Sequence, residues 1–428
     1  MGLAPTPIHE QVRPLTGIYL DNNATTPLAE AVAAAMAECD RAGYANPASS
    51  HAAGRRARRV IEEARDEIGR LLGADSSGVS GDRVVFTSGG TEANNLAVLG
   101  LAAAVGGRHG RGRQETGDRR ELAGDSAGDL VEGLQPHAII SAIEHPSVVG
   151  PAEMLARLGW RVDRLSVSAA GVVRAEEVER LITADTRLVS VMLGNNETGA
   201  LQPVAEIAAI CRQYGIAVHT DAVQAVGKIA VDFRSLGVDA MTVAAHKFHG
   251  PRGIGALVLR STAQIEPILF GGFQQAATRP GTESVTLAVG MCAALRLWRA
   301  DAERRERQLR ELRDSFEAAL RAGWPGLVVN GMEAARLPHT SNVSLVGLDR
   351  QALLMALDIA GIYCSTGSAC ASGSNEPSPV LLAMGCDDAV VGSALRFSFG
   401  ISNTAAEVSE AVSRILKVAN DLQSRKKR

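Results

Sequence analysis

The sequence lacks several features that would have pointed to a particular compartment or partner. Its six cysteines stand at positions 39, 211, 292, 364, 370 and 386, and none forms a Cys-x-x-Cys pair. This spacing argues against a zinc site or a disulfide framework and favours the reducing cytoplasm. No apolar run is long enough to span a bilayer, which predicts a soluble protein. The net charge of -3 is close to balance, so we expect neither nucleic acid nor a membrane as partner.

Nucleotide-binding patterns are also missing. Neither G-x-x-x-x-G-K-S/T nor G-x-G-x-x-G occurs, so we do not expect a bound nucleotide. What remains is a chain of 428 residues, of which 46% are hydrophobic. A chain of this size and composition can bury one large core and a smaller one.

Apolar segments alternate with amphipathic helical patterns, as a doubly wound parallel sheet requires. A helical pattern over Val204–Tyr214 ends at Gly215, as a helix ends at a C-terminal glycine. We therefore expect an α/β fold with a mostly parallel sheet flanked by helices. The predicted strands are Arg83–Thr87, Ala138–Ile143, Leu188–Leu193, Ile216–His219, Ala240–Val243 and Ile254–Leu259.

Polar side chains follow three of these strands, namely Asn196, Asp221 and Lys247. Parallel sheets carry their chemistry where the strands end, so we predict that these side chains converge. Burial lowers the pKa of a lysine and frees its amine to attack a carbonyl, which is the Schiff-base chemistry of pyridoxal phosphate (PLP). The alternative is a surface lysine in the turn before Gly250 and Pro251.

The segment Ser88–Asn95 lies between the predicted strand Arg83–Thr87 and a helical run. Its small residues let backbone N–H groups approach a phosphate, and Thr91 can add a hydroxyl. The segment alone is equally typical of an ordinary strand-to-helix turn with a threonine cap and Glu92 in the first turn.

Asp221 has a definite role if PLP is bound, because a carboxylate facing the pyridine nitrogen keeps it protonated. Asn196 and Gln224 could then bind the ring hydroxyl. The alternative for Asp221 is a helix N-cap.

Seven segments in order resemble the signatures of the cysteine desulfurases, which are PLP enzymes of the class V aminotransferase, fold-type I group. The resemblance runs from about Tyr19 to the last helix, and one insertion, Gly106–Gly133, interrupts it. Mixed charge and few apolar groups predict that the insertion is a solvated, disordered loop. The segments are Tyr19–Pro27, Asn46–His51, Phe86–Glu92, Glu144–Pro146, Gly194–Gly199, Ala245–Lys247 and Arg279–Glu283.

The resemblance implies a PLP site. Lys247 would hold PLP as a Schiff base, Asp221 would pair with the pyridine nitrogen, and His145 would stack on the ring and act in acid and base steps. Asn196 and Gln224 would bind the ring oxygen. The phosphate would be bound by Gly90, Thr91 and His246, and by Thr282 from the other subunit of a homodimer.

Two further positions bear on binding. Arg396 would clamp the substrate carboxylate with a bidentate fork, although a surface salt bridge is an alternative. The residue three before the lysine is often a phosphate-binding serine in this family, and here it is Ala244. Losing a hydrogen bond to a charged group costs about 1.5–3 kcal/mol, so weaker PLP binding is an expectation.

Cys370 decides the implied reaction. Small polar residues surround it from Ser365 to Pro377, which predicts a mobile loop and not the apolar setting of a structural cysteine. Its thiolate would take sulfur from PLP-bound L-cysteine as a persulfide, leaving L-alanine. The loop length resembles that of desulfurases that pass sulfur to a scaffold protein, so Cys370 could also contact an iron-sulfur cluster during transfer. No intrinsic metal is expected.

We therefore predict a cysteine desulfurase that supplies sulfur to an acceptor in iron-sulfur cluster or thio-cofactor assembly. The alternatives are a class V aminotransferase, which would need no mobile cysteine, a selenocysteine lyase, and a non-enzymatic PLP-binding scaffold. We expect a large PLP-binding domain over residues 31–298 and a small domain over residues 299–428. Residues 1–30 are expected to belong to the small domain. An amphipathic helix over Trp298–Leu320 would connect the two.

Overall fold

The computed structural model describes residues 17–75, 81–106, 135–367 and 376–426. The predicted insertion beyond Gly106, and Cys370, lie outside the described residues. Within them, the largest sheet has seven strands in the order β2-β8-β7-β6-β5-β3-β4. Six of these strands run in the same direction, and β8 is antiparallel to both of its neighbours. The strands are β2 Arg83–Thr87, β3 His137–Ser141, β4 Arg161–Leu165, β5 Thr186–Ser190, β6 Ala217–Asp221, β7 Ala240–Ala244 and β8 Gly255–Leu259.

All six predicted strands are present, at boundaries that agree to within about three residues. The prediction missed β4. This strand reads Arg-Val-Asp-Arg-Leu and lies at one edge of the sheet, where only Leu165 is fully buried. An edge strand that is half exposed needs no continuous apolar run, so its sequence lacks the hydrophobic pattern that predicts a strand.

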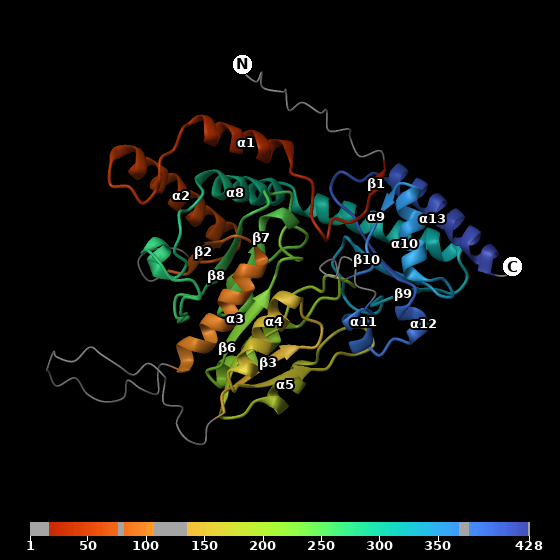
Figure 1. The fold of residues 1–428 in the computed structure, drawn as a ribbon, viewed down its shortest axis with the longest axis horizontal. Coiled ribbons are helices and arrows are strands. Elements are labelled where there is room, and N and C mark those ends of the chain that lie inside the picture. Colours follow the sequence, from red (N-terminus) through yellow and green to blue (C-terminus); the bar gives the residue numbers. More distant parts are fainter. Residues whose placement is uncertain (1–16, 76–80, 107–134, 368–375, 427–428) are drawn as a thin grey trace, which may run out of the picture.

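Helices cover both faces of this sheet (Figure 1). Val84 and Phe86 of β2 belong to one hydrophobic core and Val85 to the other, because successive side chains of a strand point to opposite faces. On the first face lie α1 Glu30–Arg41, α2 Ala52–Leu71, α5 Ala175–Leu181, α6 Val204–Gln213, α7 Phe233–Leu236 and α8 Val285–Arg299. On the second face lie α3 Gly90–Gly106 and α4 Pro146–Arg157.

A smaller group of elements packs beside the large sheet, in teal to blue in Figure 1 except for β1, which is red. Its antiparallel sheet has the order β12-β10-β9, and β1 pairs with β11 alongside. The strands are β1 Ile18–Tyr19, β9 Leu327–Val329, β10 Thr340–Leu345, β11 Ile362–Tyr363 and β12 Ala394–Ser398. The helices are α9 Ala302–Gly323, α10 Arg350–Ile359, α11 Pro379–Ala383, α12 Asp388–Val391 and α13 Ala405–Lys426.

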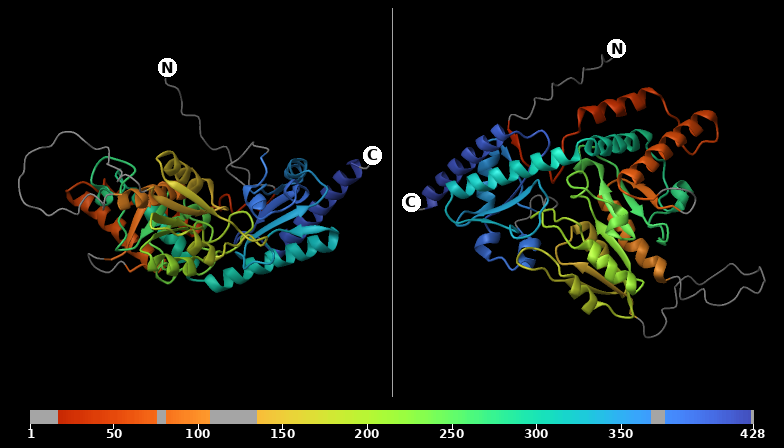
Figure 2. Two further views of the ribbon diagram at one scale, coloured as in Figure 1. Left: turned by 90° about the horizontal axis from the view of Figure 1, so that it is seen from below. Right: turned by 180° about the vertical axis from the view of Figure 1, so that it is seen from behind.

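The expected connecting helix over Trp298–Leu320 is two helices, because α8 ends at Arg299 and α9 begins at Ala302. The apolar side chains of α9 are buried, namely Leu309, Leu312, Phe316 and Leu320. The ring of Phe316 packs at a tilt against that of Phe397 of β12, with ring centroids 4.9 Å apart. Figure 2 shows α9 running under the small sheet. The same core contains Ile18 and Leu20 from near the N-terminus. We propose on this basis that residues 1–30 and 299–428 form one domain and residues 31–298 the other.

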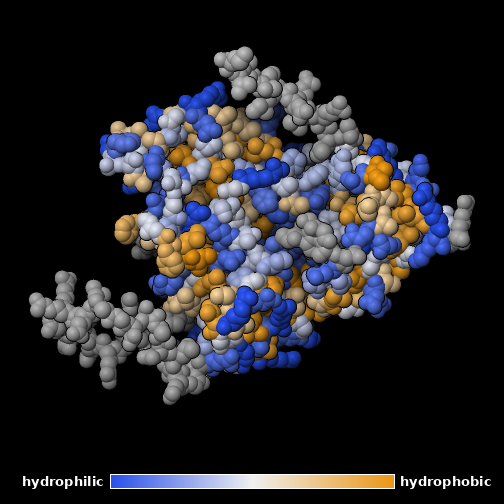
Figure 3. All heavy atoms as spheres, in the orientation of Figure 1, coloured by the Kyte–Doolittle hydropathy of each residue, from blue (hydrophilic) through white to orange (hydrophobic). Residues whose placement is uncertain are grey.

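The surface carries both polar and apolar side chains. On the face seen in Figure 3, hydrophobic residues gather over the small group near α10, where Met355 and Ile359 are 67% and 88% exposed. None of the helices in the described part of the chain has the length and hydrophobicity of a membrane-spanning segment.

Candidate active site

A cavity of about 600 Å³ lies at the carboxyl ends of the central strands. Asn196 follows β5, Asp221 ends β6, and Lys247 lies in η2, a short 3-10 helix over Ala245–Lys247 that follows β7. The structure thus brings the three strand ends together, as the topology of a parallel sheet requires. The predicted site residues that line the cavity are Gly90, Thr91, His145, Asn196, Asp221, Gln224, His246, Lys247 and Arg396.

Lys247 points into this cavity. Its Nζ donates hydrogen bonds to the carbonyl oxygens of Asn23 and Ala24, at 2.5 and 3.0 Å. These carbonyls belong to the first segment of the chain, which crosses from the small sheet to the site. The interpretation of Lys247 as a surface lysine in a turn is therefore wrong.

Asp221 is buried and held by two donors. Its Oδ1 accepts from the backbone N–H of Val223 at 2.9 Å, and its Oδ2 accepts from Asn94 Nδ2 at 2.7 Å. Asn94 Nδ2 also donates to Ser147 Oγ at 2.8 Å, and Ser147 Oγ lies 2.7 Å from His145 Nδ1. A series of hydrogen bonds through Asn94 and Ser147 thus connects His145 to Asp221. The sequence analysis did not predict a role for Asn94 or Ser147.

His145 forms the N-cap of α4, where its Nδ1 accepts from the backbone N–H of Ser147 at 3.1 Å. Burial lowers the pKa of His145, the nearby Asp221 carboxylate opposes this shift, and the charges of Lys247 and Arg396 reinforce it. Burial raises the pKa of the preceding Glu144 to about 8, although Ser141 and the N–H of Met192 donate to its carboxyl. Glu144 is therefore mostly protonated at neutral pH.

The start of α3, with Gly90 and Thr91, lines the cavity where the sequence predicts phosphate binding, and we call this part of the cavity the phosphate cup. A Cβ added to Gly90 would lie 3.0 Å from Val223 Cγ2 and 3.5 Å from the Cβ of Ala244. Glycine therefore keeps this part of the cavity open, and the methyl group of Ala244 borders it. Burial and the charge of Lys247 lower the pKa of His246, on the other side, to about 4, so the ring is neutral and can donate one hydrogen bond.

Glu92 places a negative charge in the first turn of α3 and also makes two specific contacts. Its Oε2 accepts from the backbone N–H of Ser88 at 2.6 Å, and its carboxylate pairs with both Nε and Nη2 of Arg279, at 2.6 and 3.0 Å. Glu92 thus stands in the first turn of α3, as the alternative interpretation expected, and its pairing with Arg279 ties this turn to a distant segment.

Arg396 is one of the largest fully buried side chains, with 1% of its surface exposed. Its Nη1 donates to the carbonyl oxygens of Gly367 and Asn196, at 2.8 and 3.1 Å, and its Nη2 donates to Asp21 at 2.8 Å. A surface salt bridge is therefore the wrong description. Its Nε is buried without a hydrogen-bond partner among the described residues.

These residues fit PLP and an amino-acid substrate. The cavity combines an amine, an anion-binding helix start and a buried carboxylate, which match the aldehyde, phosphate and pyridine nitrogen of PLP. Gln224 Oε1 and Arg396 Nε, both buried, have no partners in the described part of the chain. Such groups cost free energy unless a ligand completes them.

Comparisons with known proteins agree with this geometry. The family description "Aminotransferase class-V" matches residues 18–111 and 127–410. A cysteine desulfurase IscS of Dictyoglomus turgidum is 36% identical over 407 residues, which cover 95% of both chains. An IscS-like cysteine desulfurase of Mycobacterium tuberculosis is 38% identical over 401 residues, 92% of this chain and 94% of that protein. The chain belongs to the cysteine desulfurase family of class-V aminotransferases.

Solved structures give the same family and confirm the predicted fold. A NifS-like protein superposes with a TM-score of 0.81 at 30% identity and covers 95% of this chain and 100% of its own. A structure described as SspA in complex with cysteine has a TM-score of 0.72 at 28% identity, and covers 89% of this chain and 98% of its own.

In this cysteine desulfurase, one buried carboxylate contacts both sides of the segment that carries Cys370. Ser378 Oγ donates to Glu197 Oε2 at 2.6 Å, and a Cβ added to Gly367 would lie 2.6 Å from the same oxygen. Arg350 also donates to the carbonyl oxygen of Glu376 at 2.6 Å. Glu197 belongs to the segment Gly194–Gly199 that carries part of the family resemblance, but its contact with Ser378 was not predicted.

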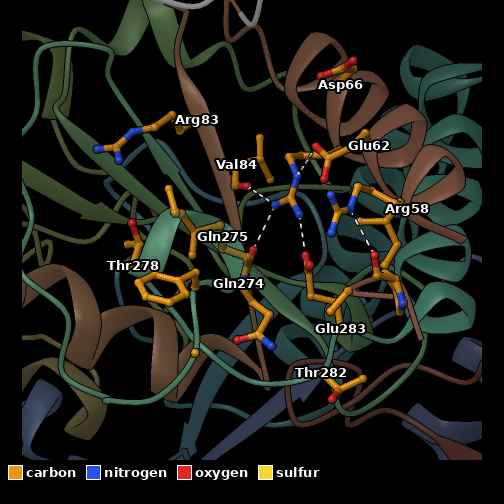
Figure 4. Close-up of a pocket in the computed structure, with 18 of the residues that line it drawn as sticks. Arg58, Glu62, Asp66, Arg83, Val84, Gln274, Gln275, Thr278, Thr282 and Glu283 are labelled. Carbon is orange, nitrogen blue, oxygen red and sulfur yellow. Dashed lines mark hydrogen bonds and ion pairs between the residues drawn. The ribbon is translucent and has the colours of Figure 1, made fainter. Parts of the chain in front are cut away.

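Thr282 is not brought to the Lys247 cavity within one chain. It lines a different cavity of about 820 Å³ (Figure 4). There Arg65 donates to Glu283 at 2.5 Å and to Gln275 at 2.9 Å, which ties the Thr282 segment to α2. A phosphate contact by Thr282 from the other subunit stays a prediction.

Proposed function

We propose that the protein is a PLP-dependent cysteine desulfurase that converts L-cysteine to L-alanine and transfers the sulfur to Cys370 as a persulfide. The observation that carries this proposal is the convergence of Lys247, Asp221 and Arg396 on one cavity. The three side chains supply an amine for the PLP aldehyde, a carboxylate for its ring nitrogen, and a guanidinium for the substrate carboxylate.

PLP, when bound, supplies an electron sink for the bonds around the α-carbon of the substrate. Lys247 would hold it covalently through Nζ, and Asp221 would keep the ring nitrogen protonated. Asn196 and Gln224 would bind the ring oxygen. The phosphate would be bound by Gly90, Thr91, His246 and, from the other subunit of a homodimer, Thr282.

Arg396 would bind the substrate carboxylate. Its two Nη atoms are already fixed by Asp21 and two backbone carbonyls, so the guanidinium is oriented before the substrate arrives, and its Nε has a hydrogen to donate. A preorganised charged donor in a buried cavity loses little conformational entropy on binding. His145 would lie against the ring and take part in the proton transfers.

Cys370 would receive the sulfur, although it lies outside the described residues. Its thiolate would attack the Sγ of the substrate, and the new S–S bond would form as the substrate Cβ–S bond breaks. The electron pair of the broken bond stays with the carbon skeleton, and protonation completes L-alanine. The cysteine complex of the related SspA supports cysteine as the substrate.

The destination of the sulfur belongs to the same proposal. We propose an acceptor or scaffold protein of iron-sulfur cluster or thio-cofactor assembly in the cytoplasm. This part rests on the family resemblance of the Cys370 loop. The names of the relatives, several of which are called IscS, agree with it.

The test is an assay of the PLP-loaded protein with L-cysteine and a thiol reductant. We expect alanine and sulfide in equal amounts, and neither from Lys247→Ala. Transamination, read as 3-mercaptopyruvate with neither alanine nor sulfide, would identify an aminotransferase. A strong preference for L-selenocysteine would identify a selenocysteine lyase. The absence of any product from the wild-type protein would contradict the proposal.

A further inference from the structure

The hydrogen-bond chain from Asp221 to His145 has only one consistent direction. A carboxylate can only accept, so Asn94 presents its NH₂ group to Asp221 Oδ2, 2.7 Å away. The second hydrogen of that NH₂ group points to Ser147 Oγ, 2.8 Å away. Ser147 Oγ is therefore an acceptor toward Asn94, and its own hydrogen remains for His145 Nδ1, at 2.7 Å.

The backbone gives an independent second constraint on the same ring nitrogen. The N–H of Ser147 donates to His145 Nδ1 at 3.1 Å, and a backbone N–H cannot accept. A hydrogen on Nδ1 would face this N–H directly. Both donors therefore require a lone pair on Nδ1, and the single hydrogen of the neutral ring must be on Nε2.

We propose that Asn94 and Ser147 are positioning residues that fix His145 in its Nε2–H tautomer and tie it to Asp221. This inference rests on the proposed function for its catalytic meaning, but the tautomer itself is a property of the resting protein. Asn94 is 1% exposed, and Ser147 and Asp221 are 7% and 6% exposed, so water does not compete strongly for these hydrogen bonds.

The tautomer determines how His145 can act. In the resting protein it presents a hydrogen-bond donor to the cavity, and proton acceptance at Nε2 requires the other tautomer and therefore loss of the Ser147 N–H bond. The charged groups that act on the ring come from three elements: Asp221 at the end of β6, Lys247 in η2 and Arg396 in β12. Asn94 donates to Asp221 directly and to His145 through Ser147. Its side-chain amide therefore positions both Asp221 and His145, which would contact PLP from two sides.

The direct test is magnetic resonance of the PLP-loaded protein with isotope-labelled histidine, in the absence of cysteine. The protein has nine histidines, and the signal lost in His145→Gln identifies the ring. We expect the hydrogen on Nε2 in the wild-type protein, and a larger fraction of the Nδ1–H form in Ser147→Ala and Asn94→Ala. A hydrogen on Nδ1 in the wild-type protein would overturn the inference.

Steady-state kinetics provide the second readout, with Asn95→Ala as the matched control. Asn95 is the next residue of α3, and its Nδ2 donates to the backbone carbonyls of Thr91 and Ser147 at 2.9 and 3.4 Å. We expect Asn94→Ala and Ser147→Ala to lower kcat by about 10- to 100-fold with KM changed less than about threefold. Equal kcat values in Asn94→Ala, Ser147→Ala and Asn95→Ala would contradict a positioning role.

The two readouts separate this inference from the proposed function. A wild-type protein that has the Nε2–H tautomer but releases no alanine would contradict the proposed function alone. A wild-type protein that releases alanine while its ring carries the hydrogen on Nδ1 would contradict the inference alone. Ser147→Ala removes one hydroxyl and keeps the backbone N–H, so it answers the question even if Asn94→Ala does not fold.

Discussion

Ser378 Oγ donates a hydrogen bond of 2.6 Å to Glu197 Oε2, and it does so across 181 residues of sequence. Ser378 stands at the N-cap of α11, where its Oγ also accepts from the N–H of Leu381 at 3.1 Å. Glu197 lines the cavity of Lys247. Ser378, which follows the segment that carries Cys370, is thus hydrogen-bonded to a residue that lines the cavity.

The first prediction concerns this contact. Ser378→Ala removes a cap and leaves a buried carboxyl oxygen without its donor, so we expect unfolding free energy to fall by about 1–3 kcal/mol. We also expect slower persulfide formation, because the segment is held less firmly, with PLP content unchanged. Urea unfolding, PLP absorbance and persulfide labelling measure the three effects. Ser315→Ala, which removes a hydroxyl bonded to Leu312 on α9, is the control and should change none of them by much.

The second prediction separates cofactor chemistry from sulfur transfer. Cys370→Ser should bind PLP and L-cysteine normally, yet it should carry no persulfide and release almost no alanine. The other cysteines near the small sheet are poor substitutes, because burial raises the thiol pKa of Cys364 and of Cys386 and so disfavours the thiolate. Normal desulfuration by Cys370→Ser would show that another thiol is the acceptor.

The third prediction concerns the phosphate cup. Ala244 borders Gly90, and Ala244→Ser would add a hydroxyl where the family often has one. We expect PLP affinity to rise about tenfold, because one hydrogen bond to a charged group contributes about 1.5 kcal/mol or more. Dissociation of PLP during dialysis, followed by absorbance, measures this. Ala53→Ser on α2 is the control, and an equal change in both variants would exclude a specific contact.

The strands of the large sheet were predictable because helices cover both faces. Inner strands such as β7 and β8 then read as largely apolar runs. The carboxyl ends of those strands located Asn196, Asp221 and Lys247 without further information. The edge strand β4 was not predictable, because its exposed residues are charged.

The contacts that orient the site residues were not predictable in the same way. Asn94 and Ser147 are 53 residues apart, and Glu197 and Ser378 are 181 apart. Neither periodicity nor local capping rules link residues at such distances. Asn94 stands one helical turn after Gly90 on α3, which was the one local signal that it could face the cavity.

The fourth prediction tests the covalent attachment of PLP. The purified protein should be yellow, and borohydride should fix PLP to Lys247. Lys247→Ala should bind PLP without a covalent link and should release no alanine. Lys228→Ala is a useful comparison, because Lys228 is also fully buried, and burial lowers its pKa to about 7, yet it does not line the cavity. Borohydride trapping on Lys228 in the wild-type protein would contradict the assignment of Lys247.

The last prediction uses the buried carboxyl of Glu144. Its pKa is about 8 in the folded protein, compared with an ordinary value of 4.5, because burial disfavours the charged form. A folded-state pKa above the unfolded value means that the contribution to stability is complete below pH 4.5 and is lost as the pH rises through 8. The wild-type protein should therefore lose stability over this range because of Glu144.

Glu144→Gln keeps the shape of the side chain but cannot ionise, so it should lose less stability over the same range. We expect the difference between the two proteins to grow by roughly 2–4 kcal/mol from acid to alkaline pH. Urea unfolding at pH values below 4.5 and above 8 measures it, and Glu153→Gln on the exposed side of α4 is the control. A pH dependence that is identical in the wild-type protein and in Glu144→Gln would show that this carboxyl ionises normally.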